Sequence, residues 1–177
     1  IFDNLLGLGS GTDWQKEVLR TDAPIIQNNF SARGGSESVS YYLATGYTSQ
    51  EGILYGEDKS FFDRFNFTTN VDVDLTDKLT ARVYNTYSNE KGSGLGDVLF
   101  NALNMSPTTP VYDANGNFGI SNTITQEVKN PLAQISNSYN ESNVNKITGK
   151  VELEYDVFKD FSITGRLGYN YVDIKDK

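Results

Sequence analysis

Glu152 and Glu154 are the two residues whose type and spacing most resemble a catalytic pair. In glycoside hydrolases two carboxyl groups flank the substrate, about 5–9.5 Å apart, and usually come from different elements. Glu152 and Glu154 lie two positions apart in an alternating segment, so they should project in parallel from one face of one strand. The chain has no His to activate a serine and no Cys. The sequence therefore predicts that the protein is not an enzyme, and that this pair belongs to a polar wall.

The segment Asp113–Asn117 (DANGN) places oxygen ligands at alternate positions, as a calcium loop does. An EF-hand loop also needs a Gly at its sixth position and a bidentate Glu at its end, and both are absent here. Asn115-Gly116 is instead a typical hairpin-turn dipeptide. We therefore expect a turn at this segment, with no metal site and no cofactor.

The composition excludes some classes of partner and favours β-structure. The formal charge of −8 argues against nucleic acid binding, which needs clustered Lys and Arg. The chain has 11 Tyr, 10 Phe and only 4 Pro, which is typical of strands. No apolar run approaches the roughly 18 residues of a membrane helix. The mean hydropathy of −0.46 still permits a membrane protein, since a transmembrane strand is apolar only at every second position.

Period-two alternation is the main structural signal. From Phe61 to Leu75 apolar and polar residues alternate with few exceptions, and the same pattern returns near the C-terminus. It predicts an all-β fold of about six consecutive antiparallel strands, at residues 25–33, 38–48, 61–75, 79–89, 146–157 and 161–174. In a membrane barrel the apolar side chains would face lipid: Val71, Val73, Val83, Val151, Leu153 and Leu167.

The predicted connections alternate in length. Tight turns at 34–37, 75–78 and 158–160 are separated by long loops at 49–59 and 90–141. Outer-membrane barrels have this asymmetry, with short periplasmic turns and longer extracellular loops. Within the second loop Gly94–Met105 (GLGDVLFNALNM) has apolar residues at helical spacing, which predicts a short helix. Leu95, Val98, Leu99, Ala102 and Leu103 would form its apolar face, either against the loop or towards a ligand or lid.

Two hypotheses fit this pattern. The first is a segment of a large transmembrane β-barrel; the smallest usual barrel has about eight strands, so we expect residues 1–177 to be a partial barrel. The second is a soluble or surface-attached antiparallel β-domain that binds carbohydrate, with the apolar face packed on an internal core.

Several phrases occur in the order and spacing of one protein family. The chain resembles SusC/RagA-like TonB-dependent outer-membrane transporters at Thr12–Arg20 (TDWQKEVLR), Gly34–Glu37 (GGSE), Tyr41–Tyr47 (YYLATGY), Gln50–Ile53 (QEGI), Arg64–Asn70 (RFNFTTN), Pro110–Phe118 (PVYDANGNF) and Asn130–Ala133 (NPLA).

The resemblance implies a barrel of about 22 strands with a plugged lumen in the bacterial outer membrane. It implies TonB-energised import of large nutrients, either glycans or oligopeptides, with a SusD-like surface lipoprotein as partner. The plug domain and the remaining barrel strands are expected to lie outside this chain, as is the part that meets TonB. Cargo contacts from the lumen or loops are then expected among six polar residues: Arg64, Asn66, Arg82, Tyr84, Asp97 and Asn101. The alternative for each is a polar lining without ligand contact.

Overall fold

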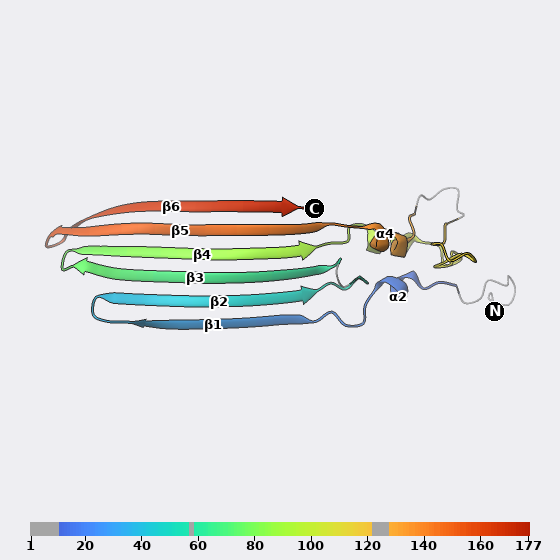
Figure 1. Cartoon of the computed structure of the whole chain (residues 1–177), viewed down its shortest axis with the longest axis horizontal. Helices are drawn as coiled ribbons and strands as arrows, with labels where there is room; N and C mark the ends of the chain where they lie inside the picture. The colour runs from blue at the N-terminus through green and yellow to red at the C-terminus, as the bar shows by residue number, and fades with distance from the viewer. Residues whose placement is uncertain (1–10, 57–58, 122–127) are drawn as a thin grey trace.

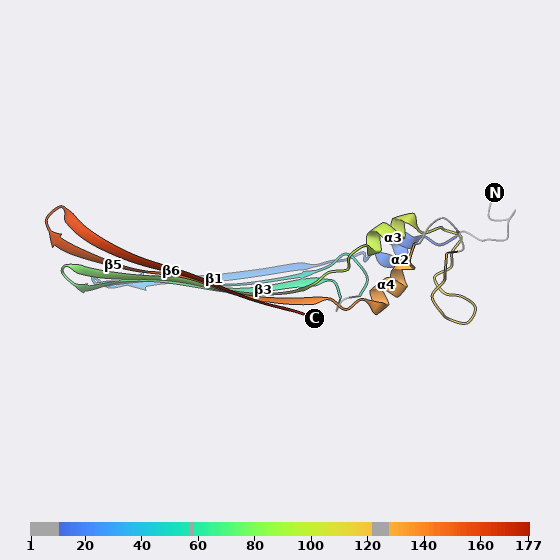
Figure 2. The same cartoon turned by 90° about the horizontal axis from the view of Figure 1, so that it is seen from above.

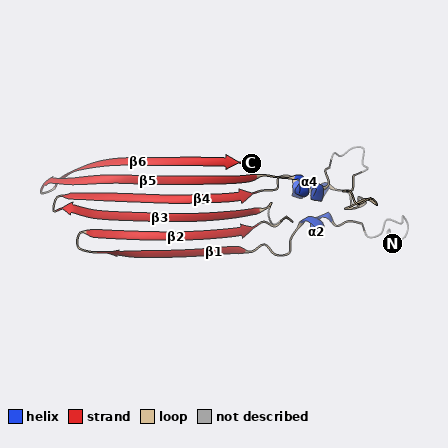
Figure 3. Cartoon of the chain, viewed as in Figure 1, coloured by secondary structure: helices blue, strands red, loops and turns tan. Residues whose placement is uncertain are grey.

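The computed structural model describes residues 11–56, 59–121 and 128–177; residues 57–58 and 122–127 of the two predicted loops lie outside this description. Six antiparallel strands form one sheet in sequence order, as the sequence predicts. Figures 1 and 3 show the strands side by side. The strands are β1 (Ile25–Gly35), β2 (Val39–Glu51), β3 (Phe61–Thr76), β4 (Leu79–Ser93), β5 (Glu141–Phe158) and β6 (Phe161–Asp176).

The sheet has an apolar face and a polar face, because successive side chains of a strand point to opposite sides. The register places four apolar side chains in one row across β3, β4, β5 and β6: Val71, Val83, Val151 and Leu167. Leu167 is 70% exposed, and Leu153, on the same face, is 49% exposed. Figure 2, which views the sheet edge-on, shows a single twisted layer with no second sheet among the described residues.

The hairpins are staggered along the sheet. The β1–β2 hairpin closes at Ser40, which lies opposite Asp72 of β3, whereas the next hairpin closes at Thr76, four residues further on (72 to 76). The third hairpin is displaced in the same direction by three residues, from Tyr155 to Phe158. In a barrel the tight turns lie at the same height along the barrel axis. With about 3.3 Å per residue and about 4.8 Å between strands, this stagger brings the turns to the same height when the strands are tilted from the axis by roughly 45–55°. Barrel strands have a tilt close to this range.

Three short helices lie beyond the end of the sheet that is opposite the tight turns (Figure 2). They are α2 (Trp14–Val18), α3 (Val98–Asn104) and α4 (Pro131–Asn137). No helix in the described ranges is long and apolar enough to cross a membrane.

The buried hydrophobic residues of the described chain gather around these helices and leave the sheet without a core of its own. Trp14 and Val18 of α2 and Val98 of α3 are at most 3% exposed. The cluster consists of Trp14, Val18, Leu54, Leu95, Val98, Ala102, Met105 and Ile135. The Trp14 indole also donates a hydrogen bond to the carbonyl oxygen of Ser106 (3.1 Å), so α2 is fixed against the segment that follows α3.

The helix expected within Gly94–Met105 is present as α3, but its buried side differs from the predicted one. Val98 and Ala102 are buried, as is Leu95 just before the helix. Leu99 is 37% exposed and Leu103 is 58% exposed. The side of α3 that packs inward therefore contains Val98 and Ala102 and leaves out Leu99 and Leu103, which were predicted to belong to it. Packing against α2 and α4 sets which side faces inward, and the local sequence does not specify it.

Candidate functional site

A row of charged residues crosses the polar face of the sheet near the tight turns. The register places Asp72 of β3 opposite Arg82 of β4, Arg82 opposite Glu152 of β5, and Glu152 opposite Arg166 of β6. Each strand contributes one charged side chain at the same level. The row therefore depends on the register and cannot be recognised in any single strand.

Glu152 is the centre of this row. Its carboxylate accepts hydrogen bonds from Arg82 Nη1 (3.0 Å) and Arg166 Nε (2.7 Å), and Lys150 Nζ lies 3.4 Å away. Glu152 is 6% exposed, and a carboxylate this buried needs such partners. Arg82 also contacts Glu154, so one guanidinium joins both carboxylates. The two acidic groups are therefore held by cations, as parts of a wall crossing three strands.

The six predicted ligand residues do not form one site. Arg82 and Tyr84 lie on β4 beside this charged row, whereas Arg64 and Asn66 lie on β3 towards the helices. Arg64 has a buried Nε atom without a hydrogen-bond partner.

The other two predicted residues belong to the loop. Asp97 caps α3 without a side-chain hydrogen bond, and Asn101 donates to Gln134 Oε1 (2.6 Å), which ties α3 to α4. The six residues therefore occupy three separate places, two on the sheet and one among the helices.

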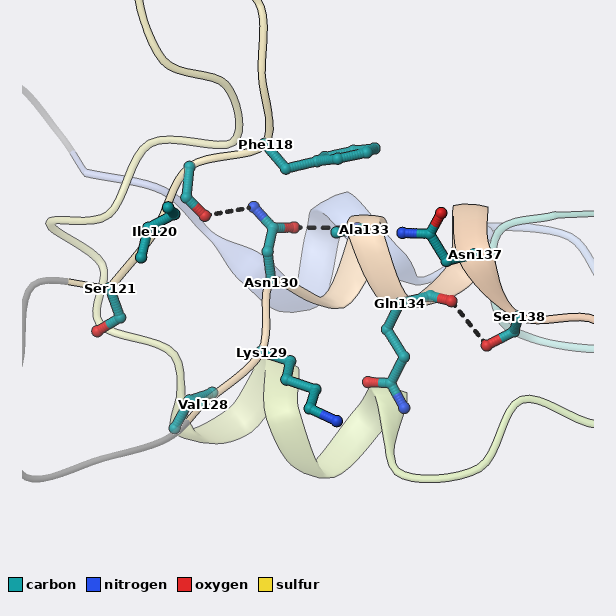
Figure 4. A pocket seen from close by; sticks show the side chains of 11 residues that line it. Phe118, Ile120, Ser121, Val128, Lys129, Asn130, Ala133, Gln134, Asn137 and Ser138 are labelled. Atoms are coloured by element: carbon teal, nitrogen blue, oxygen red, sulfur yellow. Dashed lines mark hydrogen bonds between the residues drawn. The ribbon is translucent and has the colours of Figure 1, made fainter.

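A pocket of about 460 Å³ lies between α4 and the segment that leads from Phe118 to Ser121. Figure 4 shows its lining, in which the side chains of Asn130, Gln134 and Asn137 carry amide groups, with Phe118 above them. The Phe118 ring stacks on Tyr112, with centroids 5.3 Å apart. Amides beside an aromatic ring can bind a neutral polar ligand by hydrogen bonds and ring contact.

Asn130 holds this pocket together. Its Nδ2 group donates to the carbonyl oxygens of Gly119 (3.0 Å) and Val111 (3.2 Å). Its Oδ1 atom accepts from the backbone N–H groups of Leu132 and Ala133 at the start of α4. Asn130 is 8% exposed, and its hydrogen bonds join the loop backbone at Val111 and Gly119 to the N-terminus of α4.

Asn130 was noted in the sequence only as part of the segment Asn130–Ala133, and neither its capping role nor α4 was predicted. An Asn followed by Pro is a signal for an N-cap and a first helical residue, so Asn130-Pro131 could have revealed α4. Tyr42, Asn70 and Asp72 were not predicted as site residues, although the register brings them beside Tyr84. No local signal marks those three residues, because their proximity arises from strand pairing.

The whole chain can be compared with known proteins. No family model matches it. It is 32% identical over 146 residues to TonB-dependent receptor P26 of Formosa agariphila, covering 81% of this chain and 14% of the relative. It is 27% identical over 169 residues to TonB-dependent receptor SusC of Bacteroides thetaiotaomicron, covering 82% of this chain and 16% of the relative. The chain thus spans about one sixth of the length of these relatives.

A solved structure of the RagAB peptide transporter has the same fold over this region. It matches with a TM-score of 0.72 at 17% identity, covering 94% of this chain and 19% of the matched chain. The relatives are receptors and transporters, not enzymes. By these sequence and fold relationships the chain belongs to the SusC/RagA-like TonB-dependent receptors and corresponds to consecutive strands of their β-barrel.

Proposed function

We propose that the protein to which this chain belongs is an active importer in the bacterial outer membrane. The observation that carries the proposal is one sheet with an apolar and a polar face, joined by tight turns at one end only. Backbone groups in hydrocarbon must all be paired within the protein, which a sheet achieves by closing into a barrel. Such a barrel has lipid outside and water inside, and the two faces of this sheet suit those two environments.

The apolar face has the dimensions of a lipid-facing band. On β4 the outward residues run from Leu79, beside the turn, to Tyr87, and Asn89 and Lys91 follow on the same face. Nine residues at about 3.3 Å each, tilted by roughly 45°, give a height of about 21 Å, near the 25 Å of known barrels. By the strand register, aromatic side chains lie at the edges of the band, where interfacial girdles are found: Tyr47, Phe65, Tyr87 and Tyr171 on one side, Phe158 and Phe161 on the other.

In this arrangement Val71, Val73, Val83, Val151, Leu153 and Leu167 face lipid. The polar face lines the lumen, and α2, α3 and α4 stand at the extracellular mouth because they lie opposite the tight turns. Arg64, Asn66, Arg82 and Tyr84 are then lumen residues, whereas Asp97 and Asn101 belong to the mouth.

We propose a large nutrient as cargo, a SusD-like lipoprotein over the mouth, and energy from TonB through parts of the protein outside this chain. One relative is named SusC and the similar structure is a RagAB peptide transporter, so glycan and peptide both remain candidate cargoes. The polar pocket beside Asn130 lies in the region where cargo would arrive.

The test is to isolate the tagged full-length protein from native cells and identify what accompanies it. We expect it in the outer-membrane fraction, soluble only with detergent, together with a surface lipoprotein. Uptake of the co-isolated glycan or peptide should stop when TonB is deleted. Recovery of the protein as a soluble species without detergent would instead favour the soluble carbohydrate-binding domain.

A further inference from the structure

The face assigned to lipid becomes polar beyond its aromatic edge, towards the helices. The register places Lys91 of β4, Asn143 of β5 and Lys175 of β6 in one cross-strand row on this face. Each lysine follows an aromatic residue of its own strand by four residues, Tyr87 on β4 and Tyr171 on β6. At about 3.3 Å per residue and a tilt of roughly 45°, the lysine Cα atoms lie about 9 Å beyond these rings. Lysine side chains can bend back towards the membrane, so both ammonium groups reach the layer of lipid head groups, about 5–8 Å thick.

The asparagines of β5 in this region present donors to a ligand. Asn89 Nδ2 donates to the Oδ1 atoms of both Asn143 and Asn145, each at 2.8 Å. The Tyr87 hydroxyl also donates to Asn145 Oδ1 (3.0 Å). The acceptors of the two asparagines are therefore occupied, whereas their Nδ2 groups donate to no partner within the described ranges. An amide N–H in this position is available to an acceptor outside the chain.

The two lysines of the row are weakly held by the protein. Lys91 Nζ lies 3.6 Å from Glu141, and its side chain is 44% exposed. Lys175 Nζ lies 3.4 Å from Asp173, and its side chain is 72% exposed. Exposed ion pairs of this length contribute little, so an anionic group can compete for both ammonium groups. Lys91 Nζ also lies 5.7 Å from the ring centroid of Phe61, on the same face, which keeps this ammonium on the lipid side of the sheet.

The row selects an anion that has several acceptor oxygens. Across β4, β5 and β6 it contains only donors, since Glu141 and Asp173 lie in the rows on either side. Asp63 of β3 lies opposite Lys91, so the donor row ends at β4. With about 4.8 Å between neighbouring strands, the two lysine Cα atoms are about 10 Å apart, which lets both side chains close on one compact group. A phosphate fits, because its oxygens can accept from both ammonium groups and from the amide between them.

We infer that Lys91, Asn143 and Lys175 form a binding site for a phosphate on the head group of an outer-leaflet lipid. A lipid fits this site better than a free phosphate, because acyl chains lying on the adjoining apolar band would place the head group at the row. The inference rests on the proposed function, since it takes the apolar face as the lipid-facing side of a barrel. It adds a specific lipid contact on the outside of the barrel, away from the cargo.

The test is lipid binding to the purified full-length protein in detergent, followed by native mass spectrometry. The probes are lipid A with two phosphates on its disaccharide head group, the same glycolipid without its phosphates, and inorganic phosphate alone. We expect the phosphorylated lipid to bind with a Kd at least tenfold lower than that of the dephosphorylated one. Lys91→Gln and Lys175→Gln should each raise the Kd of the phosphorylated lipid by about fivefold.

Lys146→Gln is the matched control and should leave the Kd unchanged. Lys146 is on β5 and is 44% exposed, as Lys91 is, but it lies on the polar face, where it pairs with Glu90. Heat-modifiable migration of every variant checks that the barrel is folded. The inference is overturned if the phosphorylated lipid does not bind, if the dephosphorylated lipid binds equally well, or if the two lysine variants bind as the unmodified protein does. Inorganic phosphate that binds at these lysines as tightly as the lipid would also overturn it, in favour of a site for a soluble anion.

The lipid-binding and transport assays separate this inference from the proposed function. Binding of the phosphorylated lipid that depends on Lys91 and Lys175, in a protein without TonB-dependent uptake, would support the site and contradict the importer. TonB-dependent uptake by a protein whose lipid affinity is the same with and without the two lysines would support the importer and contradict the site.

Discussion

Arg82 on β4 lies directly opposite Glu152 on β5, with Arg82 Nη1 3.0 Å from Glu152 Oε1. The same guanidinium contacts Glu154, and Arg166 approaches Glu152 from β6 at 2.7 Å. These ion pairs therefore link β4, β5 and β6 through side chains, in addition to the backbone hydrogen bonds between the strands. The contribution of these ion pairs to stability depends mainly on Glu152, because its side chain is far less exposed than those of Arg82 and Arg166.

Glu152→Gln should lower the thermal midpoint of the folded barrel by a few degrees. The substitution removes the charge that three cations share and leaves Arg82 and Arg166 only partly compensated. Glu154→Gln should cost less, because the Glu154 side chain is 30% exposed and its ion pair within the described ranges is with Arg82. The measurement is loss of the heat-modifiable form on a temperature series in detergent.

Lys175→Gln is the control, since Lys175 forms an exposed ion pair with Asp173 that should contribute little. Equal midpoints for Glu152→Gln and Lys175→Gln would contradict a structural role for the charged row.

Val83→Lys should impair membrane assembly. Val83 lies midway between Leu79 and Tyr87 on the apolar face, where a lysine costs about 2–4 kcal/mol at the bilayer midplane. Thr86→Lys, on the polar face of the same strand, should have little effect because it faces water. The measurement is the folded fraction in isolated outer membranes. Equal folding of the two variants would contradict the assignment of the apolar face to lipid.

The sheet was predictable because its period-two pattern depends on neighbouring residues alone. The ends of the strands nearest the helices were not. The structure extends β5 back to Glu141 and β4 on to Ser93, beyond the predicted limits at 146 and 89. Asn89 there donates to both Asn143 and Asn145, on the face that is apolar further down. Both faces are polar at this level, so the alternation that marks a strand disappears.

The helices and the cross-strand groups of side chains were harder to predict, for different reasons. α2 has five residues and α4 has seven, too few to show a helical period. The grouping of Tyr42 with Asp72 and Tyr84 requires the pairing of three strands. One strand's pattern specifies which face a side chain occupies but not which neighbours it meets.

Trp14→Ala should loosen the helices without unfolding the sheet. The indole is 3% exposed in the helical core, and truncation of such a residue costs about 3–5 kcal/mol. It also removes the hydrogen bond to the Ser106 carbonyl oxygen. Hydrogen exchange should rise in α2 and α3 and stay unchanged in β3 to β5. Leu103→Ala is the control, because Leu103 is 58% exposed; a similar rise in that variant would argue against a specific role for Trp14.

The turn at Asp113 should lose its order in acid. Asp113 Oδ1 accepts hydrogen bonds from the backbone N–H groups of Asn117 (2.9 Å) and Asn115 (2.8 Å). These bonds, that from Asn117 foremost, lower the pKa of Asp113 below its usual value. A carboxyl whose pKa is lower in the folded state stabilises the turn above its unfolded pKa, about 3.9, and loses that contribution as pH falls through the folded value.

Hydrogen exchange of the Asn115 and Asn117 amides, corrected for intrinsic rates, measures this loss. Protection in the unmodified protein should hold from neutral pH down to the usual range of an aspartate and decline below it. In Asp113→Asn the protection should be lower at neutral pH and should not vary with pH, because the uncharged amide oxygen is a weaker acceptor and does not titrate. The same acid-dependent decline in both proteins would show that another group controls the turn.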